Sequence, residues 1–183
     1  MQNRTWSAGI LGFTAVGMLA VILTAKPAHA ANSNGPYYAE PAWDQKLPVQ
    51  NRFLVLSNWN NEAVLDRETG LVWERVPEST TGVWNAMIGV CANKNVGGRK
   101  GWRMPAFAEL ASLIEPSAKN PALPADHPFA NVTLAAYWSA TTRAEVPTTA
   151  WLVDFRDALV GSIIKTISLH VWCVRGPMHE SLY

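Results

Sequence analysis

Two short aromatic stretches decide how this chain can fold: Gly101-Trp102-Arg103-Met104-Pro105 and Val171-Trp172-Cys173-Val174-Arg175-Gly176. The only two cysteines belong with them, because Cys91 precedes the first stretch by ten residues and Cys173 stands inside the second. A bond between these cysteines would close a loop of 173 − 91 = 82 residues. Such bonds persist only in an oxidising compartment. The cysteines therefore bear on both the fold and the location of the protein.

In a chain that leaves the cytoplasm, the simplest interpretation of two cysteines is one disulfide, here Cys91 to Cys173. The alternatives are two free thiols, or half of a metal site that other residues would have to complete. A disulfide closing so long a loop restricts the unfolded chain by about 4 kcal/mol. We expect the bonded form.

The first thirty residues have the pattern of a secretory signal peptide. Arg4 gives a positive start, residues 8–25 are apolar and uncharged, and Ala28-His29-Ala30 is a small-x-small cleavage site. The alternative is an uncleaved membrane anchor, since the apolar run approaches the ~20 residues that span a bilayer. Pro27 interrupts the run, so we predict cleavage after residue 30 and no stable membrane insertion afterwards.

Cleavage leaves residues 31–183, enough chain for one domain with a single core. Removing Arg4 and Lys26 leaves 15 − 2 = 13 basic residues against 14 acidic ones. This near-neutral balance gives no overall attraction for nucleic acid or for an anionic membrane. Any binding of a polyanion must therefore come from a local patch.

The N-terminal half of the mature chain predicts a lead-in followed by a hairpin. Residues 31–50 are rich in Asn, Pro and Ala and predict a flexible segment, so the domain is expected at residues 51–183. Apolar runs at residues 63–65 and 71–73 flank a turn that ends in Gly70, which predicts a β-hairpin.

Two helices are expected next. Thr80 or Thr81 can cap the first, whose core side carries Trp84, Met87, Ile88 and Cys91 at helical spacing. Pro105 suits the first turn of the second, whose apolar side carries Phe107, Leu110, Leu113 and Ile114.

The C-terminal half predicts a loop and then strands. Residues 115–131 carry four prolines and no hydrophobic period, which predicts a long surface loop. Runs rich in β-branched and aromatic residues predict four strands, at residues 137–139, 151–155, 159–164 and 170–174. Two helices packed on a small twisted antiparallel sheet, with long loops, make up the expected α+β fold.

Four motifs, in this order along residues 50–178, resemble the Lcl C-terminal domain family, a bacterial extracytoplasmic family catalogued as a domain of unknown function. They are Asn61-Glu62-Ala63-Val64-Leu65-Asp66 with Gly70-Leu71-Val72-Trp73-Glu74, Gly101-Trp102-Arg103-Met104-Pro105 with Glu109-Leu110, Tyr137-Trp138-Ser139-Ala140-Thr141, and Val171-Trp172-Cys173-Val174-Arg175-Gly176. The resemblance implies a C-type lectin-like fold of the kind shared with formylglycine-generating enzymes. It also implies ligand-binding loops, since members of the family have been linked to sulfated glycans. Met104 stands where leucine is usual, a volume-conserving change.

A basic, glycine-rich loop is the first candidate binding site. Lys94, Arg99, Lys100 and Arg103 fall within ten residues that contain no acid. Such side chains hold sulfate or carboxylate groups through charge-assisted hydrogen bonds, and glycines let backbone N–H groups approach the ligand. The alternative is a solvated loop in which Arg103 pairs with Glu109.

Trp59 is the second candidate, because it stands in a turn beside Asn60 and two further asparagines. A ring that stacks on a sugar face and amides that bond its hydroxyls make a carbohydrate platform. The alternative is a tryptophan that folds back as a lid on the core. Trp73, Trp84, Trp102, Trp138, Trp151 and Trp172 are expected mostly in the core.

The sequence indicates no enzyme and no cofactor. A bonded cysteine pair leaves no thiolate for oxidase chemistry, and His127, His170 and His179 have no nucleophile at motif spacing. Glu115-Pro116-Ser117 only half matches a calcium-binding lectin loop, which leaves calcium open as an alternative but does not support it.

These features predict a bacterial extracytoplasmic protein, periplasmic, secreted or at the cell surface, that acts as a non-enzymatic binding or adhesion module. The expected partner is a sulfated or acidic glycan. The alternative is a structural subunit of an envelope assembly, whose partner is another envelope protein.

Overall fold

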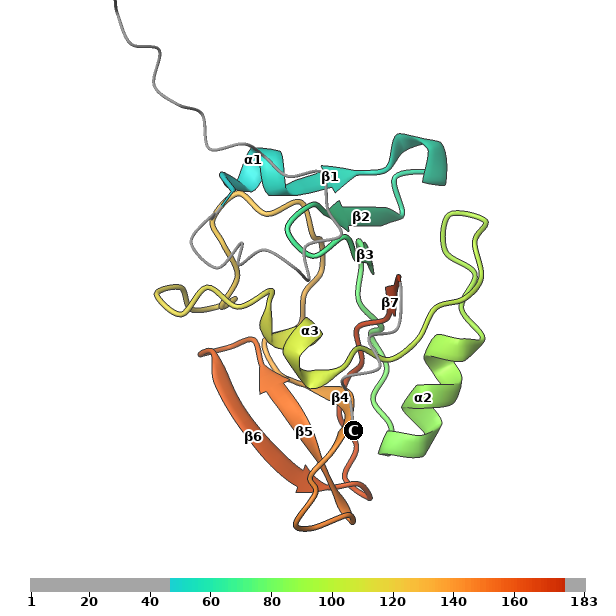
Figure 1. Cartoon of the computed structure of the whole chain (residues 1–183), viewed down its shortest axis with the longest axis vertical. Helices are drawn as coiled ribbons and strands as arrows, with labels where there is room; N and C mark the ends of the chain where they lie inside the picture. The colour runs from blue at the N-terminus through green and yellow to red at the C-terminus, as the bar shows by residue number, and fades with distance from the viewer. Residues whose placement is uncertain (1–46, 177–183) are drawn as a thin grey trace, which may run out of the picture. The chain divides into compact units, whose positions relative to one another are not determined.

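The computed structural model describes residues 47–176, which form a mixed α+β domain (Figure 1). Its helices are α1 (Val49–Arg52), the 3-10 helix η2 (Ser57–Trp59), α2 (Trp84–Ala92) and α3 (Phe107–Ala111). Its strands are β1 (Phe53–Val55), β2 (Ala63–Asp66), β3 (Val72–Glu74), β4 (Ala136–Thr142), β5 (Thr149–Asp154), β6 (Leu159–Ile164) and β7 (Val174–Arg175). The α+β class is confirmed.

The expected signal peptide at residues 1–30 lies outside the described residues, as does the expected lead-in up to residue 46. The lead-in was expected to run to residue 50, and the structure shows α1 beginning at Val49. The N–H groups of Asn51 and Arg52 both donate to the Pro48 carbonyl, and the Arg52 side chain is buried against Asp66. A charge pair with a residue 14 positions away therefore fixes this short helix, which no local pattern reveals.

The strands form two antiparallel sheets instead of the one expected, in the orders β1-β2-β3-β7 and β4-β5-β6. Strands β2 and β3 make the predicted hairpin, with Val64 opposite Trp73. Strand β7, from the C-terminal end of the described residues, pairs with the free side of β3. Trp73 therefore lies between Val64 of β2 and Val174 of β7.

Residues 170–173 explain why there are two sheets. This segment was expected to lie in a strand, but it crosses from one sheet to the other. At its start, the His170 carbonyl accepts a hydrogen bond from the Trp138 N–H in β4. At its end, the Cys173 N–H donates to the Glu74 carboxylate in β3 at 3.0 Å. Only the two residues of β7 then pair as a strand.

The two predicted helices exist, but they begin later than expected. Val83 stands at the N-cap of α2 and neither threonine caps it, because the Trp84 N–H donates instead to the Lys165 carbonyl after β6. Pro105 precedes the N-cap of α3, and the Ala106 N–H donates to the Glu109 carboxylate at 2.8 Å. The buried positions Met87, Cys91, Leu110 and Leu113 agree with the predicted helical faces.

The main core is built around Trp172, which is completely buried. Its ring contacts four other aromatic rings at centroid distances of 4.8 to 6.0 Å, those of Trp73, Phe129, Tyr137 and Phe155. Its Nε1–H donates to the Glu74 carbonyl at 2.8 Å, so burial leaves no unpaired polar group on this ring. Trp138 and Trp102 are also buried, whereas Trp84 and Trp151 are half-buried.

The segment 115–131 is not only a surface loop. It has no helix or strand, as expected, but Leu123 and Phe129 enter the main core. The Ala122 N–H donates to the Phe155 carbonyl at 2.7 Å, which holds the segment against the end of β5. Its apolar residues are too few and too widely spaced to show a hydrophobic period in the sequence. Leu123 and Phe129 are nevertheless buried, because residues distant in the sequence cover them.

A disulfide joins Cys91 at the end of α2 to Cys173 just before β7, with an S–S distance of 2.03 Å. Both cysteines are completely buried. The predicted pairing is confirmed, and it ties the helix to the crossing segment. Among residues 47–176, no helix has the length and apolar character needed to cross a membrane.

Candidate functional site

The basic loop connects α2 to Trp102 and folds back on itself, with Val96 bridged to Arg99. Gly97 and Gly98 form its tip with positive φ angles of 60° and 69°. A Cβ atom at Gly97 would lie 2.5 Å from the Cβ of Trp59. Only glycine therefore allows this loop to approach the turn that carries Trp59.

The approach of the two loops creates a surface that we call the Trp59 patch, made of Trp59, Arg99, Lys100 and Arg175. The Arg99 and Arg175 guanidinium groups each lie 5.4 Å from the centroid of the Trp59 ring. Guanidinium groups at this distance are attracted to the ring by about 0.5 to 1 kcal/mol at an exposed site. The indole therefore orients two cations from segments far apart in the sequence.

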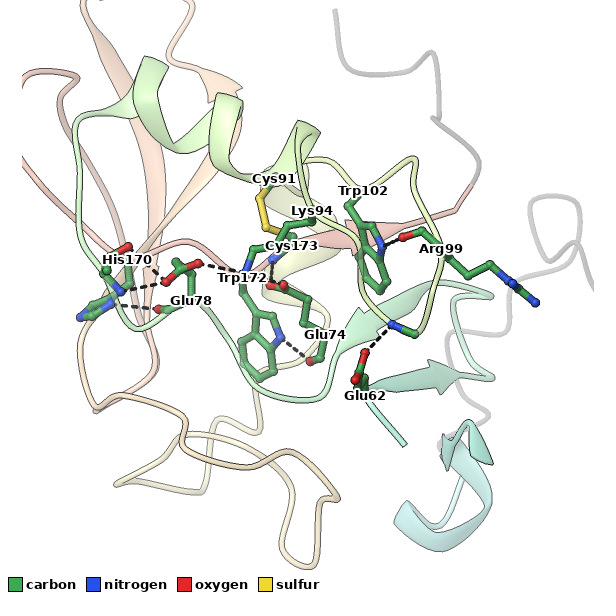
Figure 2. A network of polar contacts seen from close by, with 12 residues as sticks. Glu62, Glu74, Glu78, Cys91, Lys94, Arg99, Trp102, His170, Trp172 and Cys173 are labelled. Carbon is green, nitrogen blue, oxygen red and sulfur yellow. Dashed lines mark hydrogen bonds and ion pairs between the residues drawn. A yellow bond between two sulfur atoms is a disulfide. The ribbon is translucent and has the colours of Figure 1, made fainter. Parts of the chain in front are cut away.

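Two hydrogen bonds fix the backbone beneath the patch. The Trp102 Nε1–H donates to the Arg99 carbonyl at 2.8 Å, and the Trp102 ring meets Trp59 edge-on at 6.5 Å. The Arg175 Nε–H donates to the Lys100 carbonyl at 2.9 Å. The Arg99 side chain extends away from the Trp102 ring (Figure 2). The arginine heads are thus held on an ordered base while Arg99 and Lys100 stay exposed.

An acidic side chain already accepts a hydrogen bond from one backbone N–H group of the loop. The Gly97 N–H donates to the Glu62 Oε2 at 2.6 Å, although the loop itself contains no acid. This contact shows that the glycine tip offers its backbone to a carboxylate, as expected for successive N–H groups at a tight turn. It also means that the Gly97 donor is used within the protein.

Lys94 lies apart from the Trp59 patch, in an internal ion-pair cluster (Figure 2). Its Nζ lies 2.9 Å from a carboxylate oxygen of Glu74 and 2.9 Å from one of Glu78. Glu74 is 2% exposed. The structure therefore gives Lys94 two internal partners, whereas Arg99 and Lys100 form no ion pair among the described residues.

The three charges shift one another's pKa. Burial raises the pKa of Glu74 above its ordinary value, and the bond to Lys94 only partly offsets this. The hydrogen bond from Lys94 lowers the pKa of Glu78 to about 2. Burial by itself would lower the pKa of Lys94, but its hydrogen bonds to Glu74 and Glu78 outweigh burial and raise it. Lys94 therefore remains a cation at neutral pH.

The lowered pKa of Glu78 predicts a loss of stability in acid. A carboxyl group whose pKa is lower in the folded state stabilises the fold above its unfolded pKa, and this contribution disappears as the pH falls from about 5 to about 2. We expect Glu78→Gln to cost about 1 to 2 kcal/mol at pH 7 and much less at pH 3. Urea unfolding of both proteins at the two pH values measures this. Because Glu74 titrates in both proteins, its contribution cancels when their unfolding free energies are compared. The same difference in unfolding free energy at pH 7 and at pH 3 would therefore contradict the prediction.

Arg103 also lies outside the Trp59 patch. Its guanidinium forms two bonds of 2.6 Å to the Glu109 carboxylate. Its N–H and carbonyl pair with Val174 of β7. The expected alternative, an internal pair between Arg103 and Glu109, is confirmed. The pair holds the start of α3 against the closing strand.

A cleft of about 410 Å³ opens beside the basic loop, and its walls include Glu62, Glu74, Arg75 and Lys94. The two carboxylates in these walls balance the two cations, so the cleft has no excess positive charge to attract an anionic ligand. Of the two surfaces beside the loop, the Trp59 patch is therefore the one suited to an anion.

Among residues 47–176, no group of three or more His, Cys, Asp or Glu side chains is arranged to hold a metal ion. Glu115, in the half-matching lectin motif, accepts a hydrogen bond from the Ser117 hydroxyl at 2.8 Å. The His170 Nδ1 lies 3.3 Å from the Glu78 carbonyl. Burial lowers the pKa of His127, whose ring packs against Phe129. His179 lies outside the described residues.

The structure brings together three of the six residues predicted to bind a ligand: Trp59, Arg99 and Lys100. Asn60 follows Trp59 in a left-handed conformation, with φ of 56°, and is exposed. Arg175 was not predicted from the sequence. Its only signal was a positive charge directly after a predicted strand, and the pairing of β7 with β3 was needed to bring it to Trp59.

A family model described as the Lcl C-terminal domain matches residues 62–175, more than half of the 183 residues. No curated protein shows significant sequence similarity to the chain. The match begins just before β2 and ends with β7, so it contains the disulfide and the three cationic residues of the Trp59 patch, while Trp59 itself precedes it. With the disulfide and nearly all of both sheets inside the match, the chain belongs to the Lcl C-terminal domain family.

Proposed function

We propose that this protein is an extracytoplasmic binding module without enzymatic activity, which captures a sulfated or acidic glycan at the Trp59 patch. The observation that carries the proposal is the pair of guanidinium groups of Arg99 and Arg175, each 5.4 Å from the centroid of the same indole ring. Lys100 follows Arg99 in the loop, is exposed, and has its backbone carbonyl bonded to the Arg175 Nε–H, so it contributes a third positive charge to this part of the surface. Among the described residues, no carboxylate pairs with these three cations.

The chemistry of the patch favours sulfate or carboxylate groups. A guanidinium presents a planar fork of donors that matches two oxygens of such a group. Arginines already oriented by a ring and by a backbone hydrogen bond lose less side-chain entropy on binding. Trp59 therefore contributes by orienting the arginines, and a sugar would contact the exposed edge of this assembly.

The surroundings support a glycan over a nucleic acid. The mature chain has near-neutral net charge, 13 − 14 = −1, and the patch holds only three cations. A polymer carrying spaced sulfates or carboxylates matches so small a cluster, whereas nucleic acid affinity grows with the number of phosphates neutralised.

The test is retention on a heparin column. We expect Arg99→Ala/Lys100→Ala to elute at markedly lower salt than the unmodified protein, because two of the three cations that attract the polyanion are gone. The matched control is Arg67→Ala/Lys119→Ala, which removes the same charge from two exposed positions outside the patch. The control should elute like the unmodified protein.

Equal elution of both double variants would overturn the proposed site, and no retention of the unmodified protein would overturn the proposed ligand class. Melting temperatures of all three proteins establish that each is folded. Neither Arg99 nor Lys100 supports the core with its side chain, since both are exposed.

We also propose that the domain has C-type lectin-like architecture and acts outside the cytoplasm. The support for the architecture is a helix cysteine bonded to a residue just before the last strand, and a last strand that pairs beside the first hairpin. The support for the location is the disulfide itself, which reducing conditions would break. The alternative role, a subunit of an envelope assembly, would show as a stable protein complex with no retention on heparin.

A further inference from the structure

Strand β6 forms an open edge of its sheet, because it pairs with β5 on one side and with no described strand on the other (Figure 1). Its sequence, Leu159-Val160-Gly161-Ser162-Ile163-Ile164, contains no charge and no proline. Leu159, Val160 and Ile164 are 61%, 45% and 49% exposed. Edge strands are usually protected by charges, prolines or bulges. Within β6 itself there is no charge, proline or bulge. A charge does approach the strand from outside, because the Arg143 Nη1 donates to the Ser162 hydroxyl at 3.3 Å, but this arginine is paired with Glu145.

The direction of its backbone groups follows from one hydrogen bond. The Lys165 N–H donates to the Thr148 carbonyl at 2.9 Å, so residue 165 points its backbone toward β5. The backbone direction alternates along an antiparallel strand. Residues 159, 161 and 163 therefore bond to β5, while Val160, Ser162 and Ile164 point their N–H and C=O groups toward the open edge. The Ile164 carbonyl also accepts a hydrogen bond of 3.2 Å from the Ile167 N–H in the following turn, and its second lone pair is left for a partner.

We propose that β6 pairs antiparallel with β6 of a second copy of this chain, about a twofold axis at Ser162. In this register, Ser162 lies opposite Ser162 of the second copy and Val160 lies opposite Ile164. Each outward N–H then meets an outward C=O, and the two sheets join into one of six strands. A twofold axis makes every contact occur twice.

The side chains of β6 are complementary to a second copy of themselves. Val160 and Ile164 project from the same face of the sheet, so the proposed register brings two exposed apolar pairs into contact across the axis. The charges nearest the two ends of β6 are Asp157 and Lys165. Antiparallel pairing brings the end carrying one sign beside the end carrying the other. A partner strand with charged side chains would find no opposite charge within β6 to pair with. A second copy of β6, which is itself apolar, is therefore the better partner.

A single-cysteine variant tests the register. Ser162→Cys places one new thiol opposite its own copy, at the Cα separation of about 5.5 Å that a hydrogen-bonded pair has and that a disulfide accepts. We expect a covalent dimer on non-reducing gels after mild oxidation. The matched control is Thr166→Cys, which is exposed and close to β6 but does not meet itself in this register. Equal cross-linking of the two variants would overturn the proposed pairing.

Sedimentation equilibrium of the native protein tests the association itself. We expect a concentration-dependent dimer, weakened at least ~10-fold by Ser162→Pro, which removes an outward N–H but none that bonds to β5. Val160→Lys, which places a charge among apolar neighbours in each copy, should have a similar effect. The control Val146→Lys lies in the turn between β4 and β5, is 40% exposed, and should leave the dimer intact. A native protein that stays monomeric, or a dimer that survives both β6 changes, would overturn the proposal.

Discussion

Replacing both cysteines with alanine, Cys91→Ala/Cys173→Ala, should lower the free energy of unfolding by about 4 kcal/mol. The bond closes 82 residues of chain, and without it the unfolded state regains the entropy of that loop. For a domain of this size, the destabilisation corresponds to a melting temperature lower by roughly 10 to 20 °C. Thermal and guanidinium unfolding monitored by tryptophan fluorescence measure both quantities.

Reduction of the native protein separates the bond from the packing of the sulfur atoms. Both cysteines are completely buried, so alanine also leaves small cavities. The reduced native protein keeps the sulfurs without the bond, and its stability should fall by most of the same amount. A reductant should not affect the double variant. Unchanged unfolding of native protein whose thiols have been shown to be free would contradict this expectation.

The second large effect is expected at Lys94, which we predict to stabilise the folded state through its ion pairs. Lys94→Met removes the cation beside Glu74, whose side chain is 3% exposed. A buried carboxylate without its partner costs about 3 kcal/mol. Methionine keeps most of the aliphatic volume, so the destabilisation reflects charge and not packing. Urea unfolding at pH 7 measures it, with Lys119→Met at an exposed position as the control.

The pH dependence of this variant identifies Glu74 as the cause. Burial already raises the pKa of Glu74 in the native protein, and removal of Lys94 should raise it further. A group whose folded pKa lies above its unfolded pKa favours the fold at low pH and disfavours it as the pH rises. Lys94→Met should therefore be closest to the native protein near pH 4 to 5. Glu74→Gln added to Lys94→Met should restore stability at pH 7, and a double variant no more stable than Lys94→Met would refute this explanation.

Local sequence patterns predicted the parts of the fold that depend on near neighbours. The β2–β3 hairpin follows from two apolar runs around Gly70, and the buried face of α2 follows from the spacing of Met87 and Cys91. The division into two sheets could not be predicted. It depends on where residues 170–173 find hydrogen-bond partners, Trp138 in one sheet and Glu74 in the other.

The candidate site shows the same division. Arg99 and Lys100 were found because they are adjacent and basic in a loop that contains glycine. Lys94 has the same local composition, but its acidic partners stand 94 − 74 = 20 and 94 − 78 = 16 residues earlier, outside the loop. Arg175 stands 175 − 99 = 76 residues beyond Arg99. No window along the sequence contains these contacts, so only the folded chain shows which cations face solvent.

The crossing segment and β7 also set an order of events during synthesis. Residues 170–175 supply the partner of Cys91, the last strand of the first sheet and one of the two guanidinium groups over Trp59. A chain that terminates before residue 170 has none of these, however well its earlier helices have formed. Completion of the covalent link and of the cationic surface therefore waits until residues 170–175 have left the ribosome.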